Sequence, residues 1–240
     1  MNVKLFIFSV FLILLKPLHA QKIQIGVRTY YPPFEMMIDQ QKQFSGFDVD
    51  LMTEICNRMQ VECIFKPFPL DALFKNIQTG NISLAIGALI LTQERQQNFL
   101  FSLPYMMSHG QFVTLKSNKI NKISDICDKK IAVIKSSIYR LIAADKCSNK
   151  IQFVEYLMAP DVYPALISQD VTAFITDEKA AKYWVTNNDQ FKLLGNPIPT
   201  GTGYAIMANK NQNTLVDAIN KALLSMENDG TYLKIYATYF

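Results

Sequence analysis

An alternation of strand-like and helix-like segments, run through twice, is the feature that most constrains how this chain can fold. Residues 22–29 alternate apolar and polar side chains, as a strand does. The helical stretch after them places Phe47, Leu51, Ile55 and Met59 at every fourth position, on one face. Two successive runs of alternating strands and helices predict two α/β lobes, each with a mostly parallel sheet. The expected strands are 22–29, 61–68, 83–91, 130–135, 150–156 and 171–177, and the expected helices are 46–59, 70–80, 136–147 and 159–169.

The first twenty residues have the features of a secretory signal peptide. Lys4 supplies a positive start, Leu5–Leu15 form a nearly unbroken apolar run, and Ala20 ends a short stretch that closes on a small residue. The alternative is a membrane-anchoring helix, but the apolar run is about half of the roughly twenty residues that a membrane span requires. We expect residues 1–20 to be removed after Ala20. The residue directly after this site is Gln21 and not a cysteine, so a lipid anchor is not indicated.

The charge of the mature chain argues against some classes of partner. The formal net charge of +4 falls to +2 when Lys4 and Lys16 leave with the signal peptide. So mild an excess, without a basic cluster, does not suit nucleic acid or an anionic membrane surface. A chain of 240 residues can bury a full core, as one large domain or two small ones.

The cysteines indicate disulfides. All four, Cys56, Cys63, Cys127 and Cys147, lie in the mature chain, and an even count in an oxidising compartment is typical of bridged pairs. Three pairings are possible, and proximity along the chain favours Cys56–Cys63 and Cys127–Cys147. Zinc is the alternative, but the chain has no C-x-x-C, and His109 is the only histidine after the signal peptide. We expect no metal and no cofactor.

Six stretches, in order along the chain, resemble motifs of the family 3 periplasmic solute-binding proteins, which deliver polar amino acids to ABC importers. The resemblance covers almost the whole mature chain. EICNRMQVEC, residues 54–63, is especially close to the branch that binds lysine, arginine, ornithine or histidine, whose members carry a disulfide at this place. The six stretches are RTYYPPF from Arg28, GFDVDLMTEIC from Gly46, GALILTQERQQNFLFSLPY from Gly87, IKSSIY from Ile134, ITDEKAAKYW from Ile175 and NDGTYLKIYATYF from Asn228.

This resemblance implies an α/β fold of the type II periplasmic binding proteins, with two lobes, two crossover hinge strands and the ligand between the lobes. Lobe one is expected to comprise 23–106 plus 202–240, and lobe two 111–196. The crossovers are expected near 106–110 and 197–203. The resemblance also implies a periplasmic location, a free amino acid as ligand, an inner-membrane ABC permease as partner, no nucleic acid, and a monomer.

Two charged residues are the candidates for the head of an amino-acid ligand, whose carboxylate and ammonium both need fixed partners when buried. The T-x-E-R match assigns Arg95 to the carboxylate, because a guanidinium holds two oxygens at once. The alternative is a surface arginine on a short polar helix. Asp177 ends an apolar strand at the sheet edge where ligands bind in open α/β folds, so we assign it to the ammonium. Asp177 also suits the N-cap of the next helix, and the two roles are compatible.

Four further positions match ligand contacts of the family, but with altered side chains. Ala88 and Ile90 stand where serine or threonine is frequent, so Ala88 can offer only backbone groups and Ile90 has no hydroxyl. Ser137 and Ile138 lie in the turn before the second-lobe helix. Their N–H groups are expected to complete the grip on the carboxylate, although Ile138 replaces a frequent threonine.

The side-chain end of the expected pocket differs most from the cationic branch. Tyr31 keeps an aromatic ring that often stacks on the ligand, with packing beneath its loop as the alternative. Leu70 stands where that branch tends to have phenylalanine, and Arg28 where it has an aspartate. An arginine there repels a cationic ligand unless it turns outward to the surface, which is the alternative. Arg28 resembles the arginine of glutamate/aspartate binders, so the sequence predicts an acidic or neutral polar ligand.

These residues together predict a periplasmic receptor that binds a polar L-amino acid and passes it to an ABC importer. One alternative is a binder of cationic amino acids such as arginine, lysine or histidine. Another is a periplasmic cyclohexadienyl or arogenate dehydratase on the same fold, for which Glu35 and Glu178 are the available acids. Neither acid has a recognisable partner, so we expect no enzymatic activity.

Overall fold

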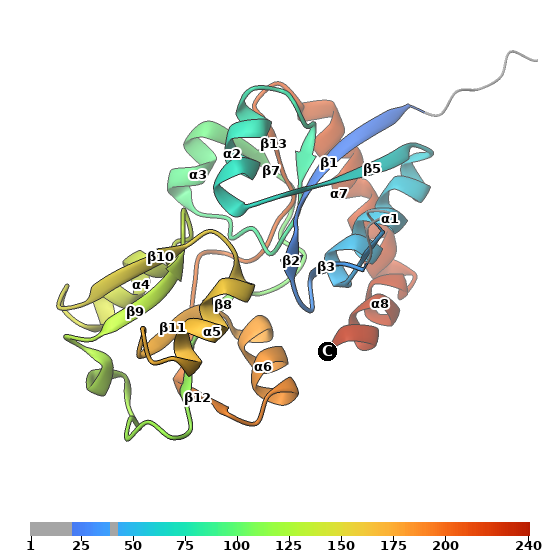
Figure 1. Ribbon diagram of the computed structural model, residues 1–240. Coiled ribbons are helices and arrows are strands. Elements are labelled where there is room, and N and C mark those ends of the chain that lie inside the picture. The colour runs from blue at the N-terminus through green and yellow to red at the C-terminus, as the bar shows by residue number, and fades with distance from the viewer. Residues whose placement is uncertain (1–20, 39–42) are drawn as a thin grey trace, which may run out of the picture.

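The computed structural model describes residues 21–38 and 43–240. The predicted signal peptide, residues 1–20, lies outside the described residues. Two five-stranded sheets, each with its own helices, form two lobes (Figure 1). The predicted α/β class with two lobes is therefore confirmed.

The first sheet contains β1 (Lys22–Arg28), β5 (Glu62–Phe68), β6 (Leu84–Ala85), β7 (Phe99–Phe101) and β13 (Met207–Asn209). Its strand order is β5-β1-β6-β13-β7. Strand β1 pairs in parallel with β5 and β6, whereas β13 runs antiparallel to β6 and β7. A small three-stranded sheet follows the end of β1 and consists of β2 (Tyr30–Tyr31), β3 (Glu35–Met37) and β4 (Phe44–Ser45).

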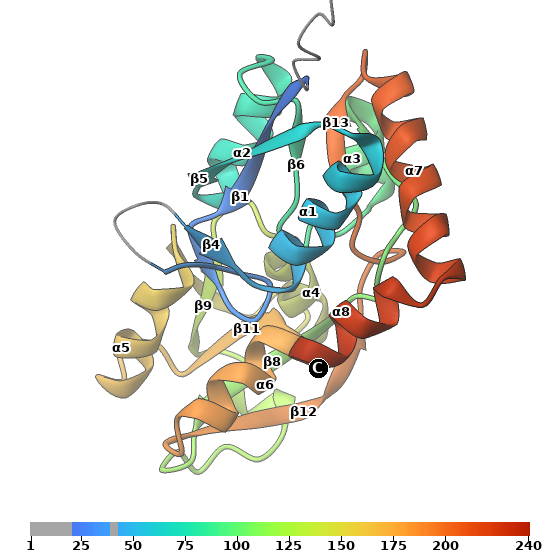
Figure 2. The same cartoon turned by 90° about the vertical axis from the view of Figure 1, so that its right-hand side faces the viewer.

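The helices of this lobe are α1 (Phe47–Met59), α2 (Leu70–Gln78), α3 (Gln93–Asn98), α7 (Asn213–Asn228) and α8 (Thr231–Tyr239). Figures 1 and 2 place α1 and α7 on the opposite side of the sheet from α2. This follows from the strand order, because β5 and β6 flank β1 on different sides and right-handed crossovers then put their helices on different faces. Helix α1 buries Phe47, Leu51 and Ile55 completely, as its spacing predicts.

The second sheet contains β8 (His109–Leu115), β9 (Lys130–Ile134), β10 (Gln152–Tyr156), β11 (Ala173–Asp177) and β12 (Phe191–Pro199). Its order is β10-β9-β11-β8-β12, with β10, β9 and β11 parallel and β8 antiparallel to both of its neighbours. The surrounding helices are η1 (Ile123–Ile126), α4 (Tyr139–Lys146), η2 (Ala159–Asp161), α5 (Val162–Ile167) and α6 (Glu178–Asn187).

The chain passes between the lobes twice, from β7 to β8 and from β12 to β13, and the two passages lie side by side. Tyr204 N donates to Met106 O over 2.8 Å, and Thr200 N donates to Ser108 O over 3.1 Å. Strand β8 already begins at His109 and β12 extends to Pro199, inside the crossover segments expected from the sequence. The exact lobe boundaries stay a prediction.

The third strand expected in the first lobe, residues 83–91, is much shorter than its apolar run suggests. Only Leu84–Ala85 form β6. Gly87 and Ala88 both have positive φ, +152° and +48°, so the backbone turns out of the sheet after Ile86. The turn lets the Ala88 N–H reach the Asp48 carboxylate at 2.7 Å. A buried apolar run can therefore form an irregular segment instead of a strand when its backbone groups make hydrogen bonds outside the sheet.

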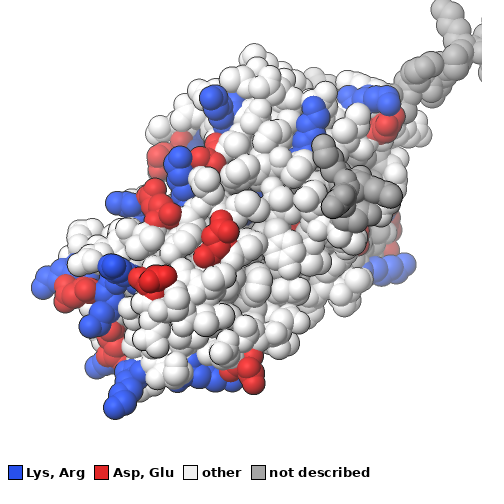
Figure 3. Space-filling view, in the orientation of Figure 1, with Lys and Arg blue, Asp and Glu red and all other residues white. Residues whose placement is uncertain are grey.

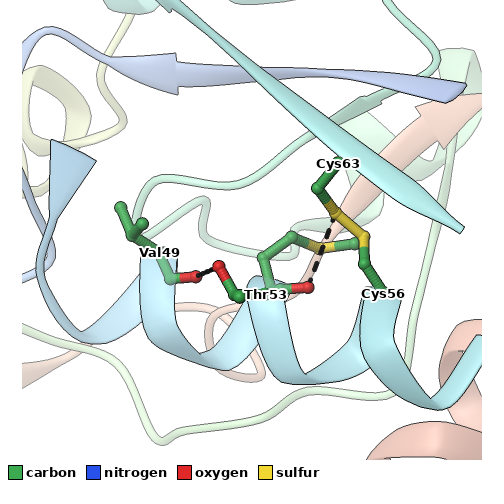
Figure 4. Close-up of a disulfide and its surroundings, with 5 residues drawn as sticks. Val49, Thr53, Cys56 and Cys63 are labelled. Carbon is green, nitrogen blue, oxygen red and sulfur yellow. Dashed lines mark hydrogen bonds between the residues drawn. A yellow bond between two sulfur atoms is a disulfide. The ribbon is translucent and has the colours of Figure 1, made fainter. Parts of the chain in front are cut away.

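Both favoured cysteine pairings are confirmed. Cys56 on α1 is bonded to Cys63 on β5, with 6.1 Å between their Cα atoms, and Figure 4 shows this bridge joining the helix to the edge strand. Cys127 is bonded to Cys147 at the end of α4, with a Cα–Cα distance of 5.3 Å. Each bridge joins elements of one lobe, so both have a structural role.

Charged side chains of both signs are scattered over the face in Figure 3. Within residues 21–38 and 43–240, none of the helices combines the length and the apolar character needed to traverse a bilayer.

Candidate functional site

A small cavity lies between the two lobes and brings together all nine residues that the sequence proposes as ligand contacts. They arrive from the carboxyl ends of strands and from the loops after them, where open α/β sheets place their sites. The lobe-one members are Arg28, Tyr31, Leu70, Ala88, Ile90 and Arg95, and the lobe-two members are Ser137, Ile138 and Asp177.

Arg95 is fixed by its own lobe and by the other one. Thr92 caps α3 by accepting a hydrogen bond from the Arg95 backbone N–H at 3.2 Å. The guanidinium donates through Nη1 to Ile90 O at 2.9 Å and through Nη2 to Ser136 O, in lobe two, at 3.2 Å. Its Cζ also lies 4.7 Å from the centre of the Phe74 ring. Burial lowers the Arg95 pKa to about 10, which still leaves the group charged at neutral pH. The alternative of a free surface arginine does not fit these contacts.

Asp177 is the acidic centre of the cavity. It is 1% exposed, and three phenols donate to its carboxylate: Tyr31 to Oδ2, and Tyr204 and Tyr139 to Oδ1, the last at 2.7 Å. The residue occupies the N-cap position of α6 but makes no side-chain capping bond. Burial raises the Asp177 pKa, and the three hydrogen bonds, that of Tyr204 first, oppose the rise. A carboxylate has about four acceptor sites, so one stays open for a ligand donor.

Arg28 ends β1 and points inward, so the alternative of an outward surface arginine is wrong. Only 7% of it is exposed. Its Cζ lies 3.2 Å from the centre of the Tyr31 ring, which also stacks on Phe34 at 6.0 Å. Tyr31 therefore packs beneath its loop, the alternative foreseen for it, and it also lines the cavity; its stacking on a ligand stays a prediction. Among the described residues, no carboxylate forms an ion pair with Arg28.

The backbone groups expected to grip a carboxylate are partly occupied within the protein. The Ala88 N–H donates to Asp48, and the Ser137 N–H donates to Ile134 O at 3.0 Å. The Ser137 hydroxyl, in contrast, is buried and has no hydrogen-bond partner among the described residues. Ser137 therefore offers its side chain rather than its amide. Leu70 and Ile138 add apolar walls.

Sequence reasoning missed two further phenols that donate to Asp177. Tyr139 lines the cavity as the first residue of α4, and Tyr204 reaches Asp177 from the second passage between the lobes. Tyr139 closes the IKSSIY stretch and lies within the helix expected over 136–147, but its residue type alone does not distinguish a cavity contact from core packing. Tyr204 follows Gly203, and no pattern around it distinguishes a site residue from a packing residue.

The family model of bacterial extracellular solute-binding proteins, family 3, matches residues 23–240. The lysine/arginine/ornithine-binding periplasmic protein of Escherichia coli is 30% identical over 229 residues, which cover 92% of this chain and 88% of that protein. Among solved structures, an arginine 3rd transport system periplasmic binding protein from Legionella pneumophila is 38% identical, covers 92% of this chain and 100% of its own, and gives a TM-score of 0.88.

An ancestral arginine-binding protein bound to glutamine is 30% identical, with 91% of this chain and 97% of that chain covered and a TM-score of 0.84. These likenesses extend over both lobes and include the site. The chain belongs to the bacterial extracellular solute-binding proteins, family 3.

Proposed function

We propose that the protein is a periplasmic receptor that binds one polar L-amino acid between its lobes and delivers it to an ABC importer. The observation that carries the proposal is the pair Arg95 and Asp177, a fixed cation and a buried anion that line one small cavity from different lobes. An amino-acid head group carries the complementary charges. The cavity is small and is lined by both lobes, as a site that encloses one small ligand requires.

The ligand that we propose is acidic or neutral and carries an oxygen at the end of its side chain. Arg28 covers the face of Tyr31, the surface on which the side chain of a cationic ligand would stack. A second cation there would meet a buried positive charge without a paired carboxylate. A distal carboxylate or amide oxygen, in contrast, accepts hydrogen bonds from the Arg28 donors. The relative named for lysine, arginine and ornithine favours a cationic ligand. Arg28 is the reason for preferring an acidic or neutral ligand.

Catalysis is not part of the proposal. Neither acid available to a dehydratase lines the cavity: Glu35 lies behind the Arg28 stem, and Glu178 is engaged with Lys182 and lies 3.5 Å from His109 Nδ1. Asp177, the acid that does line the cavity, accepts three phenol hydrogen bonds and suits a static anchor. We further propose removal of the signal peptide, export to the periplasm, docking on an inner-membrane permease and a monomeric state.

Isothermal titration calorimetry with glutamate, glutamine, aspartate, arginine, lysine and histidine tests the proposal. We expect one of the first three to bind at least about tenfold more tightly than each cationic amino acid, a difference of about 1.4 kcal/mol. An Arg28→Met variant should lose this preference while still binding the amino-acid head group. Tighter binding of arginine by the wild type would reject the ligand class, and conversion of added prephenate to phenylpyruvate would reject the absence of catalysis.

A further inference from the structure

Two carboxyl groups are buried behind the ligand cavity without lining it. Glu35, at the start of β3, and Asp48, in the first turn of α1, are both fully buried. Asp48 Oδ2 accepts the Ala88 N–H, but Asp48 Oδ1 and both oxygens of Glu35 have no hydrogen-bond partner among the described residues. A buried carboxyl group without partners is costly, above all when ionised, so the pair calls for a physical explanation.

Gly87 connects Glu35 to the ligand site. A Cβ atom at Gly87 would lie 2.8 Å from Glu35 Oε1, 3.0 Å from Arg28 Cγ and 3.2 Å from Arg28 Cδ. The carboxyl group of Glu35 and the aliphatic stem of Arg28 thus both border the space that Gly87 leaves free by lacking a side chain. The guanidinium at the end of that stem lines the cavity and lies over Tyr31. Glu35 is therefore the neighbour of Arg28 on the side away from the ligand.

The surroundings of Glu35 favour its protonated, uncharged form. Burial raises the Glu35 pKa well above its ordinary value, and Asp48 on α1 and Asp177 on β11 raise it further, whereas Arg28 on β1 opposes the rise. The remaining group that faces the pair is the phenol of Tyr105, between β7 and β8, whose own pKa is raised by burial and by the carboxyl groups of Asp48 and Glu35. Burial likewise raises the Asp48 pKa to about 7.

We propose that Glu35 is a specificity-determining residue, which sets the charge that Arg28 presents to the side chain of the ligand. An uncharged Glu35 leaves the positive charge of Arg28 uncompensated, so Arg28 attracts a distal carboxylate or amide oxygen. An ionised Glu35 cancels that charge and weakens the attraction. Binding of an acidic ligand is then linked to one proton on Glu35, and affinity falls as pH rises. The inference rests on the proposed function, because it requires the distal oxygen of the ligand to face Arg28.

The test measures binding of glutamate, or of glutamine if it binds more tightly, by calorimetry between about pH 5.5 and about pH 8.5, because burial raises the Glu35 pKa above its ordinary value. Wild type, Glu35→Gln and the surface control Glu62→Gln are compared in two buffers of different ionisation enthalpy. Wild type and the control should lose affinity with rising pH, by up to roughly tenfold per pH unit, and should take up a proton on binding. Glu35→Gln keeps the shape of the side chain and stays neutral, so it should lack the part of the pH dependence and of the proton uptake that comes from Glu35. The difference between the proteins is the readout. It reports the carboxyl pair Glu35 and Asp48 together, because the charge of Asp48 also acts on the Glu35 pKa.

The outcomes separate the two proposals. Equal pH dependence and equal proton uptake in wild type and Glu35→Gln would overturn the role of Glu35 and leave the proposed function standing. Tight arginine binding without glutamate or glutamine binding would overturn both. A measurement without any variant guards against a folding defect: infrared spectra of the ligand-free protein, with isotope-labelled glutamate, should contain a protonated carboxyl band at neutral pH. Its absence would contradict the inference directly.

Discussion

The two arginines of the cavity, Arg28 and Arg95, have different surroundings. Arg95 is oriented within its own lobe by its bond to Ile90 O, and it also donates to Ser136 O of the other lobe. Arg28 lies over the Tyr31 ring and has no paired carboxylate among the described residues. Its N–H donors are therefore not taken up by an ion pair, which is why Arg28 suits a variable side chain and Arg95 an invariant head group.

Replacing Arg95 by lysine should weaken amino-acid binding by about 2–3 kcal/mol, roughly 30- to 150-fold, because an ammonium cannot hold the two carbonyls and two carboxylate oxygens in one plane. Calorimetry measures the loss. Arg140→Lys is the matched control, since Arg140 is an exposed arginine on α4 that pairs with Glu155 at 2.7 Å. Equal affinity in wild type and Arg95→Lys would remove Arg95 from the site.

For single residues, the sequence predicts the position of the site better than it predicts the hydrogen bonds of its backbone amides. Positions such as Arg28 and Asp177 follow strands, and strand ends meet at one sheet edge whatever the details of the fold. The engagement of the Ala88 and Ser137 amides depends instead on local turns with positive φ, at Ala88 (+48°) and at Ser136 (+64°). Gly87 precedes the first of these turns but does not indicate its hydrogen bond, and no glycine marks the second, so these hydrogen bonds were not predictable.

Among the elements, the start of α1 depends most clearly on one residue. Gly46 precedes the helix with φ +132°, and a Cβ atom there would lie 2.2 Å from the carbonyl oxygen of Phe34. The Phe34 carbonyl accepts the N–H of Asp48, which holds the helix against the loop after β2. The helix itself was predictable from its spacing of apolar residues, but the reason for a glycine at its entrance was visible only in the fold.

Gly46→Ala should lower the free energy of unfolding by about 3 kcal/mol or more, because it adds a clash with backbone atoms to an unfavourable φ. Gly80→Ala is the control, since Gly80 has φ +75° and open space around its Cα. The control should lose only about 1–2 kcal/mol, from conformation alone. Urea denaturation compares the two, and equal losses would show that the contact with Phe34 relaxes.

The two disulfides should differ in their effect on stability because they close loops of different length. Cys127 and Cys147 are 20 residues apart, and Cys56 and Cys63 are 7 apart. Chain entropy predicts losses of about 3.3 kcal/mol for the double serine variant of the longer loop and about 2.4 kcal/mol for that of the shorter one. Denaturant titration under oxidising conditions measures both. A larger loss from Cys56–Cys63 would indicate that its bridge acts through the packing of α1 on β5.

For the whole molecule, contacts between the lobes determine how long a ligand stays enclosed. Besides Asp177 and its phenols, the rim carries an ion pair between Asp71 on α2 and Lys135, with 3.1 Å between Oδ2 and Nζ. On another side, the end of α8 lies beside α6 in both views (Figures 1 and 2). There Lys179 Nζ donates to the Tyr236 hydroxyl at 3.1 Å and lies 4.8 Å from the centre of the Phe240 ring. These pairs join segments far apart in sequence, which is why sequence patterns alone did not predict them.

Lys179→Met should speed ligand release about fivefold and change the association rate much less, because the contact exists only while the lobes are together and is worth about 1 kcal/mol. Lys182→Met is the matched control, since Lys182 lies on the same helix and pairs with Glu178 inside lobe two. Stopped-flow fluorescence can follow the step through Trp184, the single tryptophan, whose ring centre lies 6.3 Å from that of Tyr30 in the other lobe. Equal release rates in both variants would mean that α8 does not help to hold the lobes closed. A slower association in Lys179→Met alone would mean that the contact guides closure instead of maintaining it.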